Sequence, residues 1–273
     1  MELRESAERL LALHRGPILV LPNAWDVASA RVVEEAGFPA VATSSAGMAA
    51  VLGYPDGERV PRDEMLGMVS RIARAVRVPV TADLEAGYGS VGATVEAALR
   101  AGAVGMNLED GRRDETALAT VEEHAASVRE ARAAADRLGV HFVINARTDV
   151  YLARVGPEAE RFAHTLRRAA AYLAAGADCI FVPGVRDAET IGRLAAAIRG
   201  PLNVLAGPGT PPVAKLASLG VARVSAGSNP MRAALTAARR AVEEMRDRGT
   251  YSFAEGILTH AEVNALLADR KPR

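Results

Sequence analysis

The sequence is nearly free of cysteine and lysine, and each shortage excludes a class of chemistry. Cys179 is the only cysteine among 273 residues, which excludes an intrachain disulfide framework and a cysteine-based zinc cluster. It lies in an apolar run, where a buried structural thiol is more common than a nucleophile. The only lysines are Lys215, within a predicted helix, and Lys271, in the C-terminal tail. Because a Schiff-base aldolase needs a lysine inside its active site, we do not expect that chemistry.

Excess charge and long apolar segments are missing as well. The 33 basic and 33 acidic residues cancel, so no basic field is available to hold the phosphates of a nucleic acid. No uninterrupted apolar segment reaches the length that spans a membrane, and no signal-peptide apolar region follows the charged residues 1–5. We therefore expect a cytoplasmic protein that binds neither nucleic acid nor membrane.

What the sequence does contain is a repeated unit: a short apolar run, a turn and a longer helical pattern. The apolar runs begin near Ile18, Ala40, Val78, Val104, Phe142, Asp178, Leu202 and Val221. The helical patterns lie at about 26–36, 62–76, 90–101, 117–138, 157–175, 187–198, 211–219 and 229–247. Apolar strands that alternate with helices are typical of a parallel sheet covered on both faces, and eight such units favour a closed (β/α)8 barrel.

We interpret residues 1–273 as a single α/β domain of the TIM-barrel type. The barrel core is predicted at about 16–247, after a short amphipathic helix at 3–14. A further helical pattern at about 250–268 follows the eighth unit. This extra C-terminal segment is expected either to close the base of the barrel or to pack on a neighbouring subunit.

Acidic residues stand at the ends of neighbouring predicted strands, where barrels of this class carry their chemistry. Asp83 and Glu85 follow the third apolar run, and Glu109 follows the fourth. On an extended strand Asp83 and Glu85 point to the same side, roughly 6–7 Å apart, and repel by about 2–3 kcal/mol at an effective dielectric near 20. A divalent cation with oxygen ligands would offset this repulsion, with Mg²⁺ favoured over Mn²⁺. The alternative is that both acids lie in a solvated turn.

An arginine and a polar turn stand beside these acids. Arg147, at the end of the fifth run, suits bidentate binding of a carboxylate; the alternative is a structural salt bridge with Glu109 or Asp149. The Ser44–Gly47 turn, at the end of the second run, offers hydroxyls and backbone N–H groups to a second polar end of a ligand. Together these groups predict a combined metal and anion site.

One motif favours a different interpretation. Residues 87–92 match the G-x-G-x-x-G fingerprint of dinucleotide-binding proteins, and Glu109 follows about twenty residues later. However, Asp83 and Glu85 would direct negative charge at a pyrophosphate. We therefore interpret Gly87 and Gly89 as a flexible turn beside a metal site.

Five predicted strand ends also carry a recognisable series of motifs. They include Asn23-Ala24-Trp25-Asp26, Ser29-Ala30, Glu34-Glu35-Ala36-Gly37-Phe38, Ser44–Gly47, Leu52-Gly53 with Asp56, Asp83-Leu84-Glu85-Ala86-Gly87-Tyr88-Gly89, Leu108-Glu109-Asp110 and Ala146-Arg147. In order and spacing these stretches resemble the isocitrate lyase/phosphoenolpyruvate mutase superfamily. The likeness runs from about Ile18 to Arg232.

The resemblance implies a barrel whose last helix is swapped between subunits, in a homo-oligomer (dimer or tetramer), and Mg²⁺ bound together with a 2-oxo acid or its enolate. Asp83 would be the nearest metal ligand, while Glu85, Glu109 and Asp56 would act largely through waters. Asp56, Asp83 and Arg147 are the candidate catalytic residues. The residues that would hold the substrate carboxylate and oxo group are Ser44, Ser45, Ala46, Asp83 and Arg147.

Several positions depart from the pattern of that superfamily. The lyases carry a K-K-C-G-H loop with a proton-donating cysteine, and the mutases a longer loop with lysine and asparagine, whereas this chain has the short stretch 111–115, without cysteine or lysine. Glu85 replaces the usual second aspartate. Gly184 and Gly207 stand where the lyases have a glutamate and an asparagine. These departures argue against both the tricarboxylate lyase and the phosphoryl-transfer branches.

The sequence therefore predicts a Mg²⁺-dependent enzyme that acts on a small 2-oxo acid through an enolate. Decarboxylation of oxaloacetate or a related 2-oxo dicarboxylate is the leading hypothesis, because loss of CO₂ needs no dedicated base. Arg112 or Arg113 could bind the distal carboxylate, or could be solvated loop charges. The alternatives are a carbon–carbon lyase acting on a 2-methylisocitrate-like acid and a non-catalytic 2-oxo acid binding protein.

Overall fold

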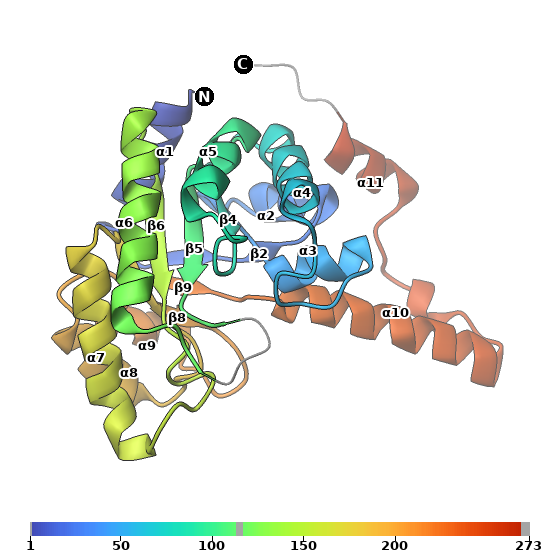
Figure 1. The fold of residues 1–273 in the computed structure, drawn as a ribbon. Coiled ribbons are helices and arrows are strands. Elements are labelled where there is room, and N and C mark those ends of the chain that lie inside the picture. The colour runs from blue at the N-terminus through green and yellow to red at the C-terminus, as the bar shows by residue number, and fades with distance from the viewer. Residues whose placement is uncertain (1, 113–116, 269–273) are drawn as a thin grey trace.

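The computed structural model describes residues 2–112 and 117–268, which form a barrel of parallel strands surrounded by helices (Figure 1). The strands are β1 (Leu19–Leu21), β2 (Asn23–Ala24), β3 (Val41–Thr43), β4 (Val80–Asp83), β5 (Gly105–Glu109), β6 (Val143–Arg147), β7 (Cys179–Val182), β8 (Leu202–Leu205) and β9 (Arg223–Ser225). They are adjacent in the order β1-β9-β8-β7-β6-β5-β4-β3-β2. The predicted TIM-type barrel is confirmed.

The first strand of the barrel is split into two halves. Pro22 separates β1 from β2, since it has no N–H group to donate to a neighbouring strand. β1 pairs with β9 and β2 pairs with β3, so the two halves together join the two edges of the sheet. Asn23 spans the same gap with its side chain. Its Oδ1 accepts hydrogen bonds from the backbone N–H groups of Ala226 and Gly227, both at 2.8 Å, and its Nδ2 donates to Thr43 O at 2.7 Å.

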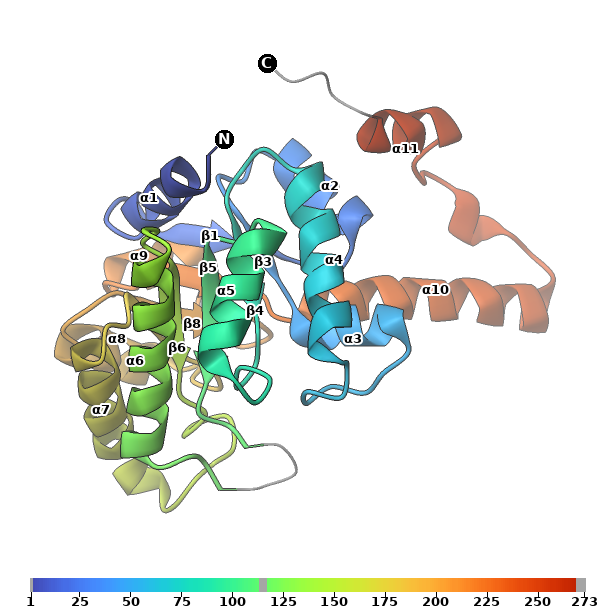
Figure 2. The same cartoon turned by 45° about the horizontal axis from the view of Figure 1, so that its top comes forward.

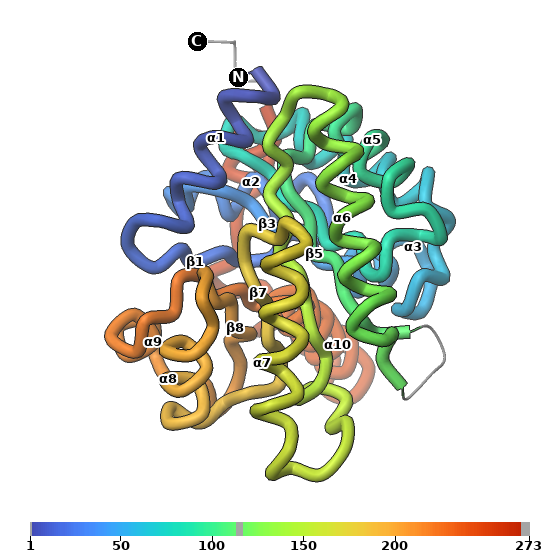
Figure 3. The backbone as a smooth tube through the Cα atoms, turned by 60° about the vertical axis from the view of Figure 1, so that its left-hand side comes forward, coloured from blue at the N-terminus to red at the C-terminus, as the bar shows by residue number. Residues whose placement is uncertain are grey.

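Eight helices follow the predicted helical patterns. They are α2 (Val27–Glu35), α4 (Arg62–Ala75), α5 (Val91–Ala101), α6 (Val121–Arg137), α7 (Glu158–Ala174), α8 (Ala188–Ala197), α9 (Val213–Ser218) and α10 (Asn229–Arg248). Most of them bury an apolar face against the barrel, whereas most of α10 does not. α1 (Leu3–Leu13) precedes the first strand. In Figure 3, α6 and α7 lie side by side on the outside of the barrel.

Two segments differ from the expectation. The Ser44–Gly47 stretch is not a turn but the start of an additional helix, α3 (Ser45–Leu52). Ser44 is its N-cap residue and accepts a hydrogen bond from Gly47 N–H at 3.2 Å, which is the role that serine favours at a helix start. The stretch 250–268, expected to be helical throughout, contains only the 3-10 turn η1 (Ser252–Ala254) and the helix α11 (His260–Leu267). Gly249 ends α10 with a φ of 63°, so the helix cannot continue.

The C-terminal segment leaves the barrel. α10 extends outward past α3 and α4, and the chain then returns so that α11 lies against α2 (Figures 1 and 2). Arg31 of α2 donates from Nε to Leu266 O at 2.7 Å. Leu235, Val242 and Ile257 are 57%, 61% and 61% exposed, so this segment presents a row of uncovered apolar side chains.

No helix in residues 2–112 and 117–268 is both long enough and apolar enough to cross a bilayer. The predicted cytoplasmic location and the assignment of residues 1–273 to one domain stay predictions.

Candidate active site

A cavity of about 520 Å³ opens at the carboxyl ends of the strands. Its wall combines polar groups from the ends of β3, β4 and β6 with loops that follow β7, β8 and β9. The lining residues include Asn23, Ser44, Ser45, Ala46, Asp56, Asp83, Asn107, Arg147, Phe181, Gly184, Arg186, Gly207, Asn229 and Arg232. The cavity therefore brings together six of the predicted site residues, with Glu85 and Glu109 outside its wall.

Asp83, the last residue of β4, is held by donors on both carboxylate oxygens. Ser45 donates to Oδ2 from its hydroxyl at 2.8 Å and from its backbone N–H at 3.1 Å. Asn107 donates from Nδ2 to Oδ1 at 3.3 Å. The Asp83 N–H in turn donates to Thr43 Oγ1 at 2.9 Å. These hydrogen bonds fix the orientation of the Asp83 carboxylate, which borders the cavity.

Glu85 forms hydrogen bonds that connect the loop after α3 with the loop after β4. Its Oε2 accepts from Glu58 N–H at 2.5 Å, and its Oε1 accepts from Tyr88 Oη–H at 2.8 Å. Tyr88 N–H donates back to Glu58 Oε1 at 2.7 Å. All three residues have a positive φ between 51° and 54°, which is costly for residues other than glycine and persists only where surrounding contacts impose it. Burial raises the pKa of Glu85 to about 7.

Arg147, the last residue of β6, lies between two carboxylates. It contacts Asp149 through Nε–Oδ1 at 2.6 Å and Nη2–Oδ2 at 2.8 Å, and Glu109 through Nη1–Oε2 at 2.5 Å. Both salt bridges that the sequence offered as alternatives are therefore present, and the arginine still borders the cavity. Burial raises the pKa of Glu109 to about 8, and Arg147 only partly opposes this.

The acids are divided between two cavities. Asp83 borders the first, while Glu85 and Glu109 line a second cavity of about 250 Å³, and Asp56 borders both. Burial raises the pKa of Asp56 above its ordinary value. Raised pKa values in three neighbouring carboxyl groups indicate a region in which negative charge is costly and a cation would be favourable.

The donor set fits Mg²⁺ or Mn²⁺, because every candidate ligand is an oxygen atom. Across the described parts of the chain, no three His, Cys, Asp or Glu side chains gather closely enough to hold a metal ion by themselves. This arrangement suits an ion that keeps several waters and takes one or two carboxylates directly, as Mg²⁺ commonly does. The assignment of Asp83, Glu85 and Glu109 as metal-site residues stays a prediction.

Two basic residues of the cavity wall escaped the sequence analysis. Arg186 comes from the loop after β7, and Arg232 from the first turn of α10. Neither arginine stands at a predicted strand end or in one of the motifs that carry the resemblance. Arg112, which the sequence offered as a ligand for a distal carboxylate, instead lines the second cavity and pairs with Glu123 at 2.5 Å. Arg113 lies outside the described residues.

Cys179 agrees with its predicted structural role. The thiol is fully buried in β7, and burial raises its pKa to about 12. A thiol in such surroundings is neither a thiolate nucleophile nor a metal ligand.

Comparisons with known proteins place this site in a family of enzymes. A family model described as phosphoenolpyruvate phosphomutase matches residues 10–246. An oxaloacetate decarboxylase of Ectopseudomonas mendocina (strain ymp) is 32% identical over 273 residues, which cover 95% of this chain and 90% of that protein.

Solved structures agree with the sequence comparisons. 2,3-dimethylmalate lyase, described as a PEP mutase/isocitrate lyase superfamily member, matches with a TM-score of 0.83 and 27% identity, covering 96% of this chain and 94% of that one. A phosphonopyruvate hydrolase in complex with oxalate and Mg²⁺ matches with a TM-score of 0.83 and 28% identity, covering 97% and 95%. The chain therefore belongs to the phosphoenolpyruvate phosphomutase family, within the isocitrate lyase/PEP mutase superfamily of enzymes.

Proposed function

We propose that this protein is a Mg²⁺-dependent enzyme that acts on a small 2-oxo acid through an enolate, and that it decarboxylates oxaloacetate or a related 2-oxo dicarboxylate. One observation carries the proposal: a single cavity holds a fixed carboxylate, Asp83, beside Arg147, and two further arginines, Arg186 and Arg232, border it. A dicarboxylate needs a cationic group for each of its ends, and this cavity offers both.

The 2-oxo carboxylate end would bind between Arg147 and the start of α3. Ser45 and Ala46 lie in the first turn of this helix, where backbone N–H groups have no intrahelical carbonyl to bond and favour negative charge. Ser45 N–H already donates to Asp83, whereas Ser44 holds the turn through Gly47. We infer that Ser44, Ser45, Ala46 and Arg147 orient the carboxylate and the oxo group, in agreement with the resemblance.

The metal would lie on the Asp83 side of the substrate. When bound, Mg²⁺ supplies a Lewis acid that polarises the 2-oxo group and stabilises developing negative charge. Asp83 would hold the ion directly, and Asp56, Glu85 and Glu109 would hold it largely through waters. The phosphonopyruvate hydrolase complex with oxalate and Mg²⁺ supports this arrangement, since oxalate has the same paired oxygens as a 2-oxo acid.

Decarboxylation is favoured over carbon–carbon lysis by what the cavity lacks. Breaking the C3–C4 bond of oxaloacetate releases CO₂ and leaves its electron pair in the enolate, so no base has to remove a proton in that step. The enolate formed in either reaction must afterwards be protonated, but a lyase must in addition deprotonate a hydroxyl group. Gly184 and Gly207 border the cavity where the resemblance places the lyase glutamate and asparagine, and a glycine has no side chain that could take part in proton transfer. The decarboxylase relative supports this choice.

A carbon–carbon lyase reaction on a 2-alkylmalate or 2-methylisocitrate-like acid is the second candidate. It is supported by the matching 2,3-dimethylmalate lyase structure and by Asp56, a carboxyl group with a raised pKa at the border of both cavities. A non-catalytic 2-oxo acid binding protein is the third.

The test is a titration with oxaloacetate, 2-oxoglutarate and pyruvate, in Mg²⁺ and in EDTA, that follows both melting temperature and CO₂ release. We expect Mg²⁺-dependent stabilisation together with CO₂ from oxaloacetate above the metal-only background. Asp83→Asn should abolish both effects, while Asp63→Asn, at an exposed position of α4, should change neither. Stabilisation without CO₂ would favour a lyase or a binding protein, and turnover that is unaffected by EDTA would contradict the metal site.

We also propose that the protein forms a homo-oligomer through α10 and the segment that follows it. The uncovered apolar side chains of this segment and a groove of about 800 Å³ along α10 and η1 support an exchange of this segment between two copies. Light scattering should give a dimer or a tetramer for the full chain and a smaller species after deletion of residues 250–273. A monomeric full chain would contradict this proposal.

A further inference from the structure

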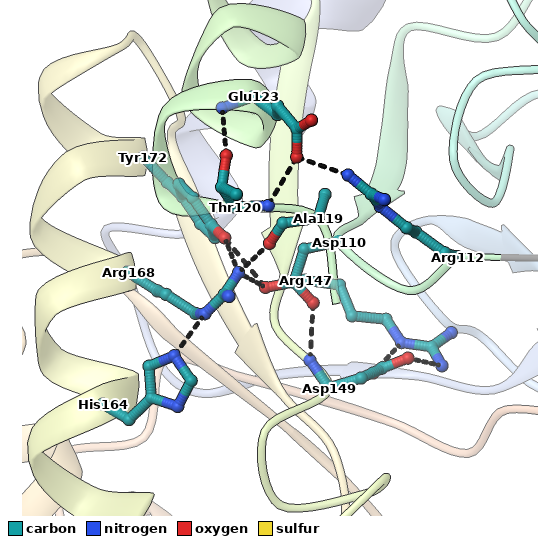
Figure 4. A network of polar contacts seen from close by, with 10 residues as sticks. All are labelled: Asp110, Arg112, Ala119, Thr120, Glu123, Arg147, Asp149, His164, Arg168 and Tyr172. Carbon is teal, nitrogen blue, oxygen red and sulfur yellow. Dashed lines mark hydrogen bonds and ion pairs between the residues drawn. The ribbon is translucent and has the colours of Figure 1, made fainter. Parts of the chain in front are cut away.

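Asp110 is a fully buried carboxylate directly after β5 that the proposed chemistry does not use (Figure 4). Its main chain joins neighbouring segments: the N–H donates to Arg147 O at 3.1 Å, and the carbonyl accepts from Ala119 N–H at 2.8 Å. Its side chain contacts the end of β6 again and one further element, since Oδ1 accepts from Asp149 N–H at 2.9 Å and Oδ2 faces α7. A single residue therefore connects the end of β6, the chain before α6, and α7.

The partners of Asp110 on α7 are Arg168 and Tyr172. Arg168 Nη1 lies 2.9 Å from Oδ2, and Tyr172 Oη donates to the same oxygen at 2.8 Å. Arg168 is 5% exposed and Tyr172 is fully buried. The same Nη1 also donates to Ala119 O at 2.8 Å. A buried ion pair offers little stability over apolar packing, so its presence here calls for another role.

A series of hydrogen bonds connects this ion pair with Arg147, the proposed substrate-binding arginine. Arg168 holds the Asp110 carboxylate, and Asp110 holds the backbone N–H of Asp149. The Asp149 carboxylate then takes two donors of Arg147 in a bidentate contact. Figure 4 shows these side chains in series, with Arg168 at one end and Arg147 at the other. Arginine has many rotamers, so an orientation suited to a carboxylate requires a fixed acceptor.

We propose that Arg168 is a positioning residue, which acts through Asp110 and Asp149 to hold the Arg147 guanidinium in the orientation that receives the 2-oxo carboxylate. The inference rests on the proposed function, because it takes Arg147 as the ligand of that carboxylate. Arg168 itself belongs to α7, and neither it nor any of its hydrogen-bond partners in the described parts of the chain borders either cavity of the site.

Arg168 also contacts the chain at the end of the loop that follows β5. Gly111 and Leu118 form an antiparallel bridge, and Arg168 holds the next residue, Ala119. The contacts that orient Arg147 therefore also hold both ends of this loop at a fixed distance from it.

Asp83, the proposed direct metal ligand, has supports of its own, and this separation allows a test. It is held by Ser45, Thr43 and Asn107, which among the described residues form no hydrogen bond with Arg168, Asp110 or Asp149. Glu109 does pair with Arg147, but it would hold the metal only through water. Loss of Arg168 should therefore weaken binding of the carboxylate ligand and leave metal binding unchanged. A general loss of structure would weaken both.

The experiment measures two dissociation constants on the full-length protein. Mn²⁺ binding is followed by electron paramagnetic resonance, and binding of oxalate, the probe for the 2-oxo carboxylate, by calorimetry at saturating Mn²⁺. In Arg168→Met we expect the oxalate Kd to rise on the order of tenfold, because a misoriented Arg147 would lose part of its charge-assisted hydrogen bonds to oxalate, with the Mn²⁺ Kd within about twofold of wild type. Arg167→Met, at an exposed neighbouring position of α7, is the control and should change neither.

Tyr172→Phe keeps the ion pair and removes one donor to Asp110, so it should fold even if Arg168→Met does not. Its oxalate Kd should rise roughly threefold, as expected for a modest loss of one hydrogen bond, again with unchanged Mn²⁺ binding. Wild-type oxalate affinity in a folded Arg168→Met protein, or in Tyr172→Phe if the first variant is unfolded, would overturn the inference. A parallel loss of Mn²⁺ binding would overturn it as well. A wild-type protein that binds Mn²⁺ but not oxalate would instead contradict the proposed function.

Discussion

His14 gives the structure a pH dependence that can be calculated. It follows α1, is 6% exposed, and donates from Nδ1 to Leu10 O at 2.9 Å, while its Nε2 has no partner in the described residues. Burial, helped by the positive charge of Arg223, lowers the pKa of His14 to about 4. The imidazole is therefore neutral in the folded protein across the physiological range.

The sign and size of the effect follow from linkage. The histidine binds a proton at about pH 6.5 in the unfolded chain and only at about pH 4 in the folded protein. Its contribution to stability is therefore fully present above pH 6.5 and is lost as the pH falls toward 4. With about 1.4 kcal/mol per pKa unit, the free energy of unfolding should fall by about 2 kcal/mol between pH 7 and pH 5 on account of His14 alone.

The assay compares urea unfolding of wild type and His14→Gln at pH 7 and pH 5, in EDTA. His124 is also buried with a lowered pKa, so only the difference between the two proteins isolates His14. His14→Gln should lose about 2 kcal/mol less than wild type over this range. His260→Gln, at an exposed position of α11, should retain the wild-type slope. Equal slopes for wild type and His14→Gln would refute the assigned burial and charge state.

Two further predictions concern the cavity and its loops. Arg186→Met and Arg232→Met should each raise the KM for oxaloacetate by about tenfold or more, because each removes a charge-assisted hydrogen bond worth about 1.5–3 kcal/mol, while the inhibition constant of pyruvate, which has no distal carboxylate, stays within about twofold. An equal effect on both ligands would contradict the distal-carboxylate role. Tyr88→Phe should lower the free energy of unfolding by about 1–2 kcal/mol in urea, since it removes a donor to the buried Glu85. Tyr251→Phe, 65% exposed, serves as its control, and a stable Tyr88→Phe would show that Glu85 does not depend on this contact.

The sequence predicted correctly the site residues that stand at the ends of strands. Asp83, Ser45 and Arg147 stand at strand ends, and the carboxyl ends of parallel strands meet at one rim of a barrel, so their proximity could be predicted from position alone. The barrel itself follows from the count of strand–helix units. Arg186 could not be found in this way, because it reaches the cavity from a loop.

The contacts that each site side chain makes were harder to predict than its position at a strand end. Asp83 and Glu85 lie two residues apart, yet one faces the main cavity and the other joins two loops, because the chain turns after β4 and Glu85 has a positive φ. The two alternatives for Arg147, a ligand site or a salt bridge, proved compatible, since it pairs with Glu109 and Asp149 and also borders the cavity. Spacing along a sequence fixes neither rotamers nor loop paths.

The split first strand has a consequence for the order in which the molecule can form. Asn23 bonds to Gly227, 204 residues away, so the barrel cannot close until almost the entire chain has been synthesised. Before that point β1 and β8, the two strands that pair with β9, have open backbone donors and acceptors, which favour pairing with other chains. Closure of so distant a contact is expected to be a late and slow event in folding. Asn23 therefore joins the first and last parts of the barrel at the rim of the site, and the site is complete only when synthesis of the barrel is complete.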